Sequence, residues 1–310
     1  MVLGHEAAGL VLEVGDNVSN VHPGDHVVMV FVPSCGHCMP CSEGRPALCE
    51  PGNAANGRGE LLGGGRRLSF HGEPVHHHIG VSAFASHAVL SEHSLIKIDP
   101  SIPFEIAALF GCAVLTGVGA VVNTAEVRAG QSVAIVGLGG VGLSAVLGAV
   151  VAGASRIVAV DLSDEKLEFA RKLGATDCFN ASSDTVVDEI REATKGGVDY
   201  GIEMAGSVRA LETTFAISKR GGVTITAGLA NPAHRFSLSP VTLVGEERVL
   251  RGSYVGSCVP KRDIPRFIAL YQRGRLPVDK LLTSMGHLSE INAAFDCLAE
   301  GKTVRHVIVL

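Results

Sequence analysis

The chain has 310 residues, of which 46% are hydrophobic and 18% are charged. This length fits two domains, and the hydrophobic share excludes a disordered chain because it can offset the entropy lost on folding. The 26 basic and 31 acidic residues give a net charge of −5, which excludes a basic surface for nucleic acid or anionic lipid. Glycine is frequent, at 38 residues, which indicates many tight turns or close backbone approaches.

The start of the chain and its cysteine content bear on its location. Residues 1–6 carry no basic region followed by an apolar core, so they predict neither a signal peptide nor a lipidation site. Eight cysteines are too few for a secreted disulfide scaffold of this length. We therefore expect a cytoplasmic protein with no nucleic-acid or membrane partner.

Two uncharged runs, residues 106–125 and 133–155, reach the length of a membrane-spanning helix. The second run contains six glycines and divides into a β-branched segment, a glycine turn and an Ala/Val/Leu segment. This division is typical of a buried strand, a turn and a helix, and it disfavours the membrane interpretation.

Residues 1–113 predict a β-rich domain. Short apolar runs at 9–14 and 26–32 are typical of strands. Residues 33–74, with their many glycines and prolines, predict a long irregular lobe within this domain.

Residues 114–254 alternate β-branched runs with helical stretches, which predicts an α/β fold with a doubly wound parallel sheet. The expected strands cover residues 133–136, 156–160, 198–204 and 223–227. The expected helices cover residues 141–153, 164–173, 185–194 and 208–217. Ser163 should cap the second helix and Gly174 should end it.

Residues 255–310 form a third segment, in which 260–272 and 288–299 predict helices and 305–310 predicts a strand. The segment follows the alternating region without any low-complexity linker. We interpret it as a return of the chain to the first domain.

A glycine-rich turn lies between the first expected strand of the second domain and its first helix. Gly137 would allow a tight turn, Gly139 the close approach of a pyrophosphate, and Gly142 close packing of helix on strand. The next strand ends in Asp161, whose carboxylate would bind both ribose hydroxyls and repel a 2′-phosphate, which favours NAD over NADP. The alternative is a glycine turn and a helix-capping Asp161 with no ligand. The turn consists of Gly137, Leu138, Gly139, Gly140, Val141 and Gly142.

Cys35, Cys38, Cys41 and Cys49 have the spacing C-x2-C-x2-C-x7-C. Four thiolates can complete a tetrahedral shell around Zn²⁺ with no position left for substrate, which predicts a structural zinc. An iron–sulfur cluster is less favoured because its fourth cysteine follows after three residues and precedes a proline. Disulfides or free thiols are less favoured in a cytoplasmic chain. His37 is the obvious substitute ligand, although we interpret it as a solvated loop residue.

These motifs follow one another in a recognisable order: Gly4-His5-Glu6-Ala7-Ala8-Gly9, the cysteine lobe, Gly111-Cys112, the glycine turn and Asp161. From His5 to its C-terminus, the sequence resembles the zinc-dependent, medium-chain alcohol dehydrogenases. The resemblance implies a GroES-like catalytic domain joined to a Rossmann domain, with a catalytic zinc in the cleft between them. It also implies NAD-linked conversion of alcohols to aldehydes or ketones, and a homodimer formed through an edge strand near residues 249–254.

The resemblance assigns His5 and Cys112 as ligands of the catalytic zinc, with Glu6 as the adjacent carboxylate. A zinc ion with an open position lowers the pKa of an alcohol, so that hydride can leave for the nicotinamide. Without the resemblance, His5 would be an ordinary core or loop histidine and Cys112 a small buried hydrophobe.

Further assignments follow from the same resemblance. Thr116 would lie beside the nicotinamide, Lys166 at the adenosine ribose and Arg305 at the pyrophosphate. Phe31 and Phe84 match positions in the substrate pocket, although as bare sequence they would be core aromatics. Two aromatic side chains in an apolar pocket would favour hydrophobic or aromatic primary alcohols.

Other features separate this chain from the family pattern. The family has several dozen residues before Gly-His-Glu, where this chain has three, and these contain the first catalytic-zinc cysteine and the proton relay. Their absence should weaken zinc binding and leave a sheet edge and apolar surface unpaired. The loop after Cys49 lacks the arginine of glutathione-adduct formaldehyde dehydrogenases. We interpret the tract His76-His77-His78 as a structural loop.

Three hypotheses therefore remain. The first is a zinc alcohol dehydrogenase whose recorded start is too late. The second is an NAD- and zinc-binding protein without catalysis. The third is a related polyol or formaldehyde dehydrogenase with the same zinc and hydride chemistry.

Overall fold

The computed structural model describes residues 1–310 and contains two compact units. Unit 1 combines Met1–Leu115 with Cys258–Leu310, and unit 2 is Thr116–Ser257. The C-terminal segment therefore folds with the N-terminal residues, so that unit 1 is discontinuous in sequence.

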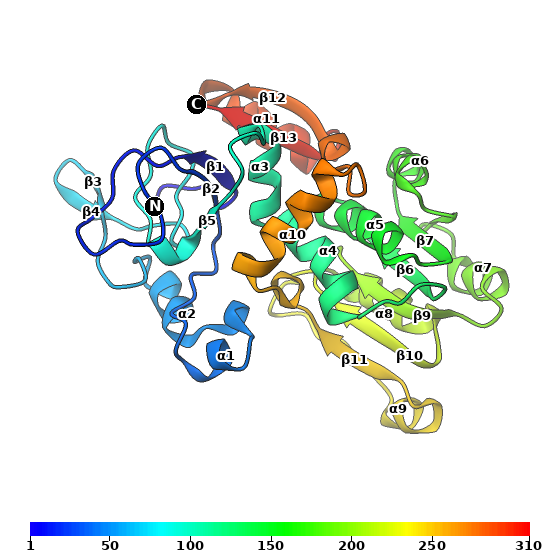
Figure 1. Cartoon of the computed structure of the whole chain (residues 1–310). Coiled ribbons are helices and arrows are strands. Elements are labelled where there is room, and N and C mark those ends of the chain that lie inside the picture. Colours follow the sequence, from blue (N-terminus) through cyan, green and yellow to red (C-terminus); the bar gives the residue numbers. More distant parts are fainter. The chain divides into compact units, whose positions relative to one another are not determined.

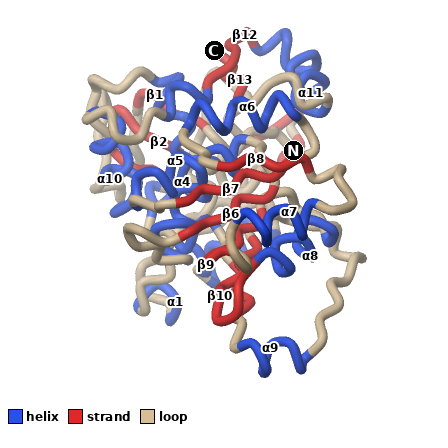
Figure 2. The backbone as a smooth tube through the Cα atoms, turned by 90° about the vertical axis from the view of Figure 1, so that its right-hand side faces the viewer, coloured by secondary structure: helices blue, strands red, loops and turns tan.

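Unit 2 is built on a six-stranded sheet in which every pair of neighbours is parallel. The spatial order is β11-β10-β9-β6-β7-β8, so the direction of winding reverses between β6 and β9 (Figures 1 and 2). This order confirms the predicted doubly wound fold. The strands are β6 (Ser132–Val136), β7 (Arg156–Asp161), β8 (Asp177–Asn180), β9 (Val198–Glu203), β10 (Ser218–Thr226) and β11 (Val249–Gly252).

The four helices predicted in unit 2 begin and end close to where their sequence signals place them. The Ser163 hydroxyl accepts a hydrogen bond from the Lys166 amide at 3.4 Å, and Gly174 ends the same helix at φ +115°, as expected for an N-cap and a left-handed C-cap. The helices are α5 (Gly140–Ala152), α6 (Asp164–Leu173), α7 (Val186–Ala193), α8 (Val208–Ile217), α9 (Pro240–Glu246) and a π-helical turn at Ala120–Thr124.

One face of this sheet packs against α7 and α8, which lie side by side (Figure 2). Alternate residues of the central strands point into this interface, as the two-residue period of a strand requires. The resulting apolar cluster makes the carboxyl end of β6 a rigid base for the glycine turn. Its buried members are Ala134, Val136, Val158, Val160, Val186, Ile190, Val198 and Ile217.

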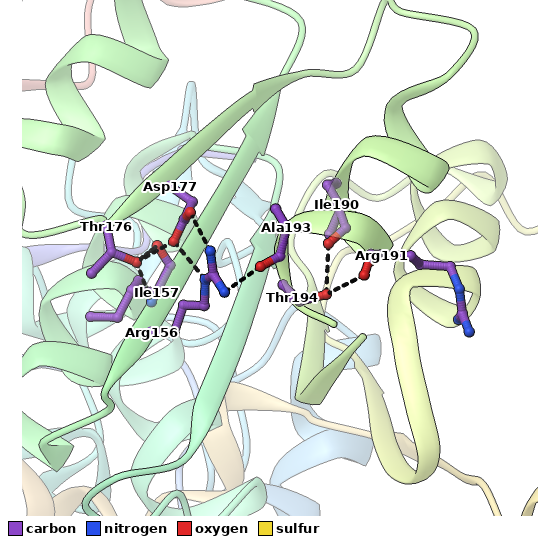
Figure 3. Close-up of polar contacts among 8 residues, drawn as sticks. All are labelled: Arg156, Ile157, Thr176, Asp177, Ile190, Arg191, Ala193 and Thr194. Atoms are coloured by element: carbon purple, nitrogen blue, oxygen red, sulfur yellow. Dashed lines mark hydrogen bonds and ion pairs between the residues drawn. The ribbon is translucent and has the colours of Figure 1, made fainter. Parts of the chain in front are cut away.

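An ion pair joins the sheet edge to a helix end (Figure 3). Arg156 on β7 donates two hydrogen bonds, of 2.9 and 2.8 Å, to the carboxylate of Asp177 on β8. The same guanidinium donates to the carbonyl of Ala193, the last residue of α7. The bidentate pair fixes the position of β8 beside β7. The sequence of β8 has no β-branched residue, and this strand was not predicted from the sequence.

Unit 1 contains a three-stranded antiparallel sheet of order β1-β2-β5, with β1 at one edge. The predicted irregular lobe carries two short helices and a hairpin, β3 with β4, so it is more regular than its composition indicates. The C-terminal segment adds the parallel pair β12 and β13.

The strands of unit 1 are β1 (Ala7–Leu10), β2 (His26–Met29), β3 (Leu68–Phe70), β4 (Glu73–Val75), β5 (Leu95–Lys97), β12 (Leu282–His287) and β13 (Arg305–Val309). The helices are α1 (Met39–Ser42), α2 (Glu50–Gly57), α3 (Phe104–Ala107), α10 (Pro260–Gln272) and α11 (Ile291–Ala299). Helix α4 (Ala113–Gly119) begins directly after Cys112.

No single helix is long and apolar enough to cross a bilayer. The segments Phe104–Gly111 and Ala113–Thr124 pass the test of length and hydropathy only together, as a pair bent by 53°. The second uncharged run of the sequence divides into β6, the glycine turn and α5, as its six glycines predict.

Candidate active site

The glycine turn occupies the carboxyl end of β6, beside the point where the strand order reverses. Gly137 has φ +94°, and a Cβ added to Gly142 would lie 1.9 Å from the Gly137 carbonyl oxygen. Glycine is therefore required at both positions by the turn itself. A Cβ added to Gly139 would meet nothing within 4 Å, so the chain's own packing does not explain that glycine.

Helix α5 begins at Gly140 without a side-chain cap. The orphan N–H groups of its first turn are therefore available to an anion, and the helix dipole favours negative charge there. An uncapped helix N-terminus behind an uncrowded Gly139 is a cradle that fits the pyrophosphate of NAD. Leu138 is fully buried and Val141 half-buried.

Asp161 ends β7 and reaches back to this turn. One carboxylate oxygen accepts a hydrogen bond from the Leu138 amide at 2.6 Å, and the other accepts one from the Ser163 amide at 3.0 Å. Lys166 lies half-buried in the first turn of α6. The structure thus places the predicted ribose-binding carboxylate at the glycine turn.

The four cysteines converge in unit 1, with all four sulfur atoms within 4.8 Å of one another. The sulfur atoms of Cys38 and Cys49 are 3.9 Å apart, close to the about 3.8 Å separation of two thiolates on one tetrahedral zinc. Backbone amides of Cys35 and Gly52 donate to the Cys49 sulfur at 3.2 and 3.4 Å. The donor set and its spacing fit a structural zinc.

The thiols of this lobe differ in acidity. A hydrogen bond from the His37 backbone lowers the pKa of Cys35 to about 7. Burial raises the pKa of Cys41 to about 12 and also raises that of Cys49. A metal ion would have to displace protons from the buried thiols, so zinc binding should release protons. The His37 side chain is exposed and contacts the Cys35 carbonyl at 2.9 Å.

A second group of metal-ligating side chains lies in unit 1, where His5, Glu6 and Cys112 bring one ligand atom each to within 4.8 Å of the others. Nε2 of His5 is 3.7 Å from a Glu6 carboxylate oxygen. Burial lowers the pKa of His5, which favours the neutral imidazole that binds metals. Three mixed nitrogen, oxygen and sulfur ligands are typical of a zinc site that keeps an open position for substrate.

Arg305 on β13 binds Glu6 directly, through an ion pair between its guanidinium and the carboxylate. The family resemblance implies a contact between this arginine and the cofactor pyrophosphate, and it does not predict the pair with Glu6. No sequence signal links two residues 299 positions apart.

A cavity of about 1340 Å³ in unit 1 includes His5 and Glu6 in its wall. Phe84 also lines it and packs against Phe295 of α11, with ring centroids 5.8 Å apart. Phe31 is buried, and its ring lies 5.3 Å from that of His5. Both predicted pocket aromatics are thus found in unit 1, Phe31 beside the metal-ligating group and Phe84 on the cavity wall.

Thr116 is buried in α4, one residue before Gly117. A Cβ at Gly117 would lie 2.2 Å from the Val141 carbonyl oxygen in the first turn of α5. The threonine is therefore held where α4 passes close to the start of α5.

The histidine tract has three different environments. His76 is exposed. His77 is fully buried, and its Nε2 accepts a hydrogen bond from the Arg67 amide at 3.0 Å, which fits the expected structural role. His78 lies against the metal-ligating group, with its ring 5.6 Å from that of His5. The contact between His78 and His5 is not predicted by the sequence.

Both halves of the chain match known family models. Residues 1–100 match the alcohol dehydrogenase GroES-like domain, and residues 140–273 match the zinc-binding dehydrogenase model. The S-(hydroxymethyl)glutathione dehydrogenase of Escherichia coli O1:K1 / APEC is 39% identical over 311 residues, which cover 99% of this chain and 84% of that protein.

Solved structures agree with these matches. An alcohol dehydrogenase zinc-binding domain protein from Burkholderia ambifaria superposes with a TM-score of 0.95 at 38% identity. Benzyl alcohol dehydrogenase from Acinetobacter calcoaceticus superposes with a TM-score of 0.93 at 33% identity. Each match covers 100% of this chain and 84% of the other.

Proposed function

Because this chain belongs to the zinc-dependent, medium-chain alcohol dehydrogenases, we propose that it oxidises hydrophobic or aromatic primary alcohols to aldehydes. The family is NAD-linked, and the chain is an oxidoreductase that transfers hydride between an alcohol and NAD. The substrate class rests on one observation: the cavity that includes His5 and Glu6 has an apolar wall with Phe84 and Phe295 packed edge to face. Such a wall favours apolar substrates.

The side chains His5, Glu6 and Cys112 would hold the catalytic zinc, and the four-cysteine lobe a structural one. When bound, zinc lowers the pKa of the alcohol and NAD accepts the hydride. Partial burial lowers the pKa of His5, which favours the neutral imidazole that a metal ligand requires. Arg305 holds the Glu6 carboxylate on the side of β13, so this carboxylate is restrained by a cation when it is not drawn to the metal.

The cofactor site that we propose uses the glycine turn for the pyrophosphate and Asp161 for the ribose. Asp161 already accepts hydrogen bonds from two backbone amides, which fixes its carboxylate in place. A fixed negative charge at the ribose should exclude a 2′-phosphate. Thr116, Lys166 and Arg305 are proposed as further cofactor contacts, at the nicotinamide, the adenosine ribose and the pyrophosphate.

A second candidate substrate is S-(hydroxymethyl)glutathione, because the similar proteins from Escherichia coli carry that name. Residues Glu50–Gly57, which follow Cys49 and form α2, contain no arginine where the resemblance places one for the glutathione adduct, so we rank this substrate below the apolar alcohols. Polyols rank lower still because the cavity wall is apolar. A protein that binds NAD and zinc without turnover is the remaining alternative.

A substrate panel tests the proposal. NADH absorbance is followed with benzyl alcohol, S-(hydroxymethyl)glutathione and sorbitol on the zinc-loaded chain, and His5→Ala serves as the control without a metal-ligating imidazole. The proposal predicts the highest kcat/KM for benzyl alcohol and no turnover by the control. A clear preference for the glutathione adduct or sorbitol would reassign the substrate. Binding of NAD without NADH formation from any substrate would support the non-catalytic alternative.

We also propose an oligomeric state for the protein and a role for each part of the chain. We assign residues 1–113 and 255–310 to catalysis and residues 114–254 to NAD binding, in a cytoplasmic protein without nucleic-acid or membrane partners. A homodimer would form through β11, the edge strand of the large sheet, whose Val249 and Leu250 are exposed. Unpaired strand edges with apolar side chains favour pairing with a second copy. Leu250→Lys should therefore give a monomer by light scattering, and an unchanged dimer mass would exclude this interface.

A further inference from the structure

His78 occupies a position that neither the family assignment nor the histidine tract explains. Its ring contacts the ring of His5 nearly at right angles, at 82° and 5.6 Å between centroids. Phe31 makes a similar contact with His5, at 86° and 5.3 Å. His5 thus has two ring contacts, one apolar and one polar. His78 also lines the cavity that contains His5 and Glu6.

The polar atoms of the His78 ring have no partner within the protein. Nδ1 is buried and makes no hydrogen bond. Nε2 makes none either; only the His78 backbone amide is bonded, to the Ser82 hydroxyl at 2.8 Å. An imidazole that is half-buried and unpartnered loses hydration without replacement, which is unfavourable unless a ligand restores a hydrogen bond.

The neighbouring polar side chains are already engaged. Besides His78, the charged or titratable groups that act on His5 are Glu6 and Arg305, and these two form an ion pair with each other. The adjacent His77 has its own partner in the Arg67 amide. The imidazole of His78, in contrast, keeps free hydrogen-bonding capacity beside His5.

His78 does not join the metal-ligating group. The three ligand atoms within 4.8 Å of one another come from His5, Glu6 and Cys112, and His78 contributes none. Its position next to a ligand, on the wall of the cavity, points instead to contact with the substrate.

We propose that His78 hydrogen-bonds a second oxygen of the substrate, carried close to the carbinol carbon. The inference rests on the proposed function and narrows it to alcohols with an apolar frame and a vicinal or ortho oxygen. The closeness of the two oxygens follows from the 5.6 Å between the His5 and His78 rings. Either tautomer serves, because a hydroxyl can donate to one imidazole nitrogen or accept from the other.

A pair of similar-sized substrates tests this contact: 2-hydroxybenzyl alcohol and 2-methylbenzyl alcohol, which differ by a hydroxyl in place of a methyl. Discrimination is the ratio of their kcat/KM values. In His78→Phe this ratio should fall about tenfold from the wild-type value, the worth of one net hydrogen bond. His78→Gln restores a hydrogen-bonding group at the site and should recover most of the discrimination. His76→Phe, the same change at the exposed neighbour, should leave the ratio unchanged.

Two measurements without turnover separate this inference from its premises. Calorimetry with the zinc-loaded chain should show the same tenfold loss in relative affinity for the two alcohols in His78→Phe. Zinc per chain should be equal in wild type and His78→Phe, because His78 is not a ligand. If no alcohol is oxidised but the binding difference depends on His78, the contact stands and the proposed function fails.

The inference is overturned by a ratio that is the same in wild type and His78→Phe, in turnover or in binding. It is equally overturned if His78→Phe loses zinc, since His78 would then act as a metal ligand. Failure of His78→Gln to recover discrimination would show that packing, and not a hydrogen bond, sets the ratio.

Discussion

Arg305 and Glu6 form an ion pair that brings the C-terminal strand β13 to the metal-ligating group near the chain start. The two side chains are largely buried, with 23% and 15% of their surfaces exposed. A guanidinium and a metal ion would compete for the same carboxylate, so we expect the pair to control how readily Glu6 reaches a metal held by His5 and Cys112.

Removal of the guanidinium should therefore change zinc retention. Arg305→Gln frees Glu6, so transfer of the more weakly held zinc to a chelating dye should slow several-fold, since a buried charge contact is worth about 1 to 3 kcal/mol. Glu6→Gln should speed the transfer, and the double variant should behave like Glu6→Gln. Arg305→Lys, which keeps the charge, is the control. Equal transfer rates in Arg305→Gln and wild type would contradict the competition.

Substitutions at Gly139 and Gly142 of the glycine turn distinguish an effect on cofactor binding from an effect on folding. Gly139→Ala adds a methyl where nothing lies within 4 Å, so stability should change by less than about 0.5 kcal/mol. NADH affinity should nevertheless fall at least about tenfold, because the methyl would stand between the backbone and the pyrophosphate. Isothermal titration calorimetry with NADH measures the affinity. An unchanged affinity would show that the pyrophosphate does not bind at the glycine turn.

Gly142→Ala is the matched structural variant. Its methyl would lie 1.9 Å from the Gly137 carbonyl oxygen, so α5 cannot keep its place on β6. Overpacking of this kind costs about 3 kcal/mol or more. Urea unfolding should show the loss in the absence of any nucleotide, and a wild-type midpoint would show that the turn can relax.

The cysteine lobe predicts a defined metal count. Cys49→Ser removes a buried ligand whose sulfur accepts two backbone amides, so zinc per chain should fall by one and the melting temperature should decrease. Cys178→Ser is the control, because that thiol lies in unit 2 and donates to the Leu167 carbonyl. Elemental analysis of the purified variants decides the point. A zinc content equal to that of wild type would show that the four thiols do not hold an ion.

Acid should weaken the ion pair of Figure 3 in a defined window. The Arg156 guanidinium lowers the pKa of Asp177, so the pair stabilises the fold above the unfolded-state pKa of about 3.9. That stabilisation is lost as pH falls through the lower folded-state pKa. Asp177→Asn should cost about 1 kcal/mol at pH 7 and little at pH 3, since both side chains are partly exposed. Asp184→Asn, at an exposed position, is the control, and a pH-independent cost would contradict the account.

The features that could be predicted from the sequence are those that local sequence patterns determine. The glycine turn, the Ser163 cap and the Gly174 stop depend on backbone conformation and short-range hydrogen bonds, so their residues identify them. The cysteine lobe is also local, since its four cysteines lie between residues 35 and 49. Strand β8 was not predicted because Asp177 and Asn180 have low strand propensity, and the pair with Arg156 holds Asp177 in place.

The site residues that escaped prediction depend on contacts distant in sequence. The resemblance implies a cofactor contact for Arg305, which stays a prediction, and the structure adds an ion pair with Glu6 that the sequence does not predict. The His76-His77-His78 tract looks uniform as letters, yet a bend at Ile79, which has φ +44°, and the burial of His77 give its members different surroundings. The contact between His78 and His5 arises from tertiary packing, which no local pattern encodes.

Direct hydride transfer is the central claim, and isotopic labelling tests it most directly. Benzyl alcohol carrying two deuterium atoms on its carbinol carbon is incubated with NAD and the zinc-loaded chain, and the reduced cofactor is analysed by mass spectrometry. One deuterium per reduced nicotinamide, together with benzaldehyde and a slower rate than with unlabelled alcohol, is the predicted result. Reduced cofactor without deuterium, or bound NAD that is never reduced, would contradict the account.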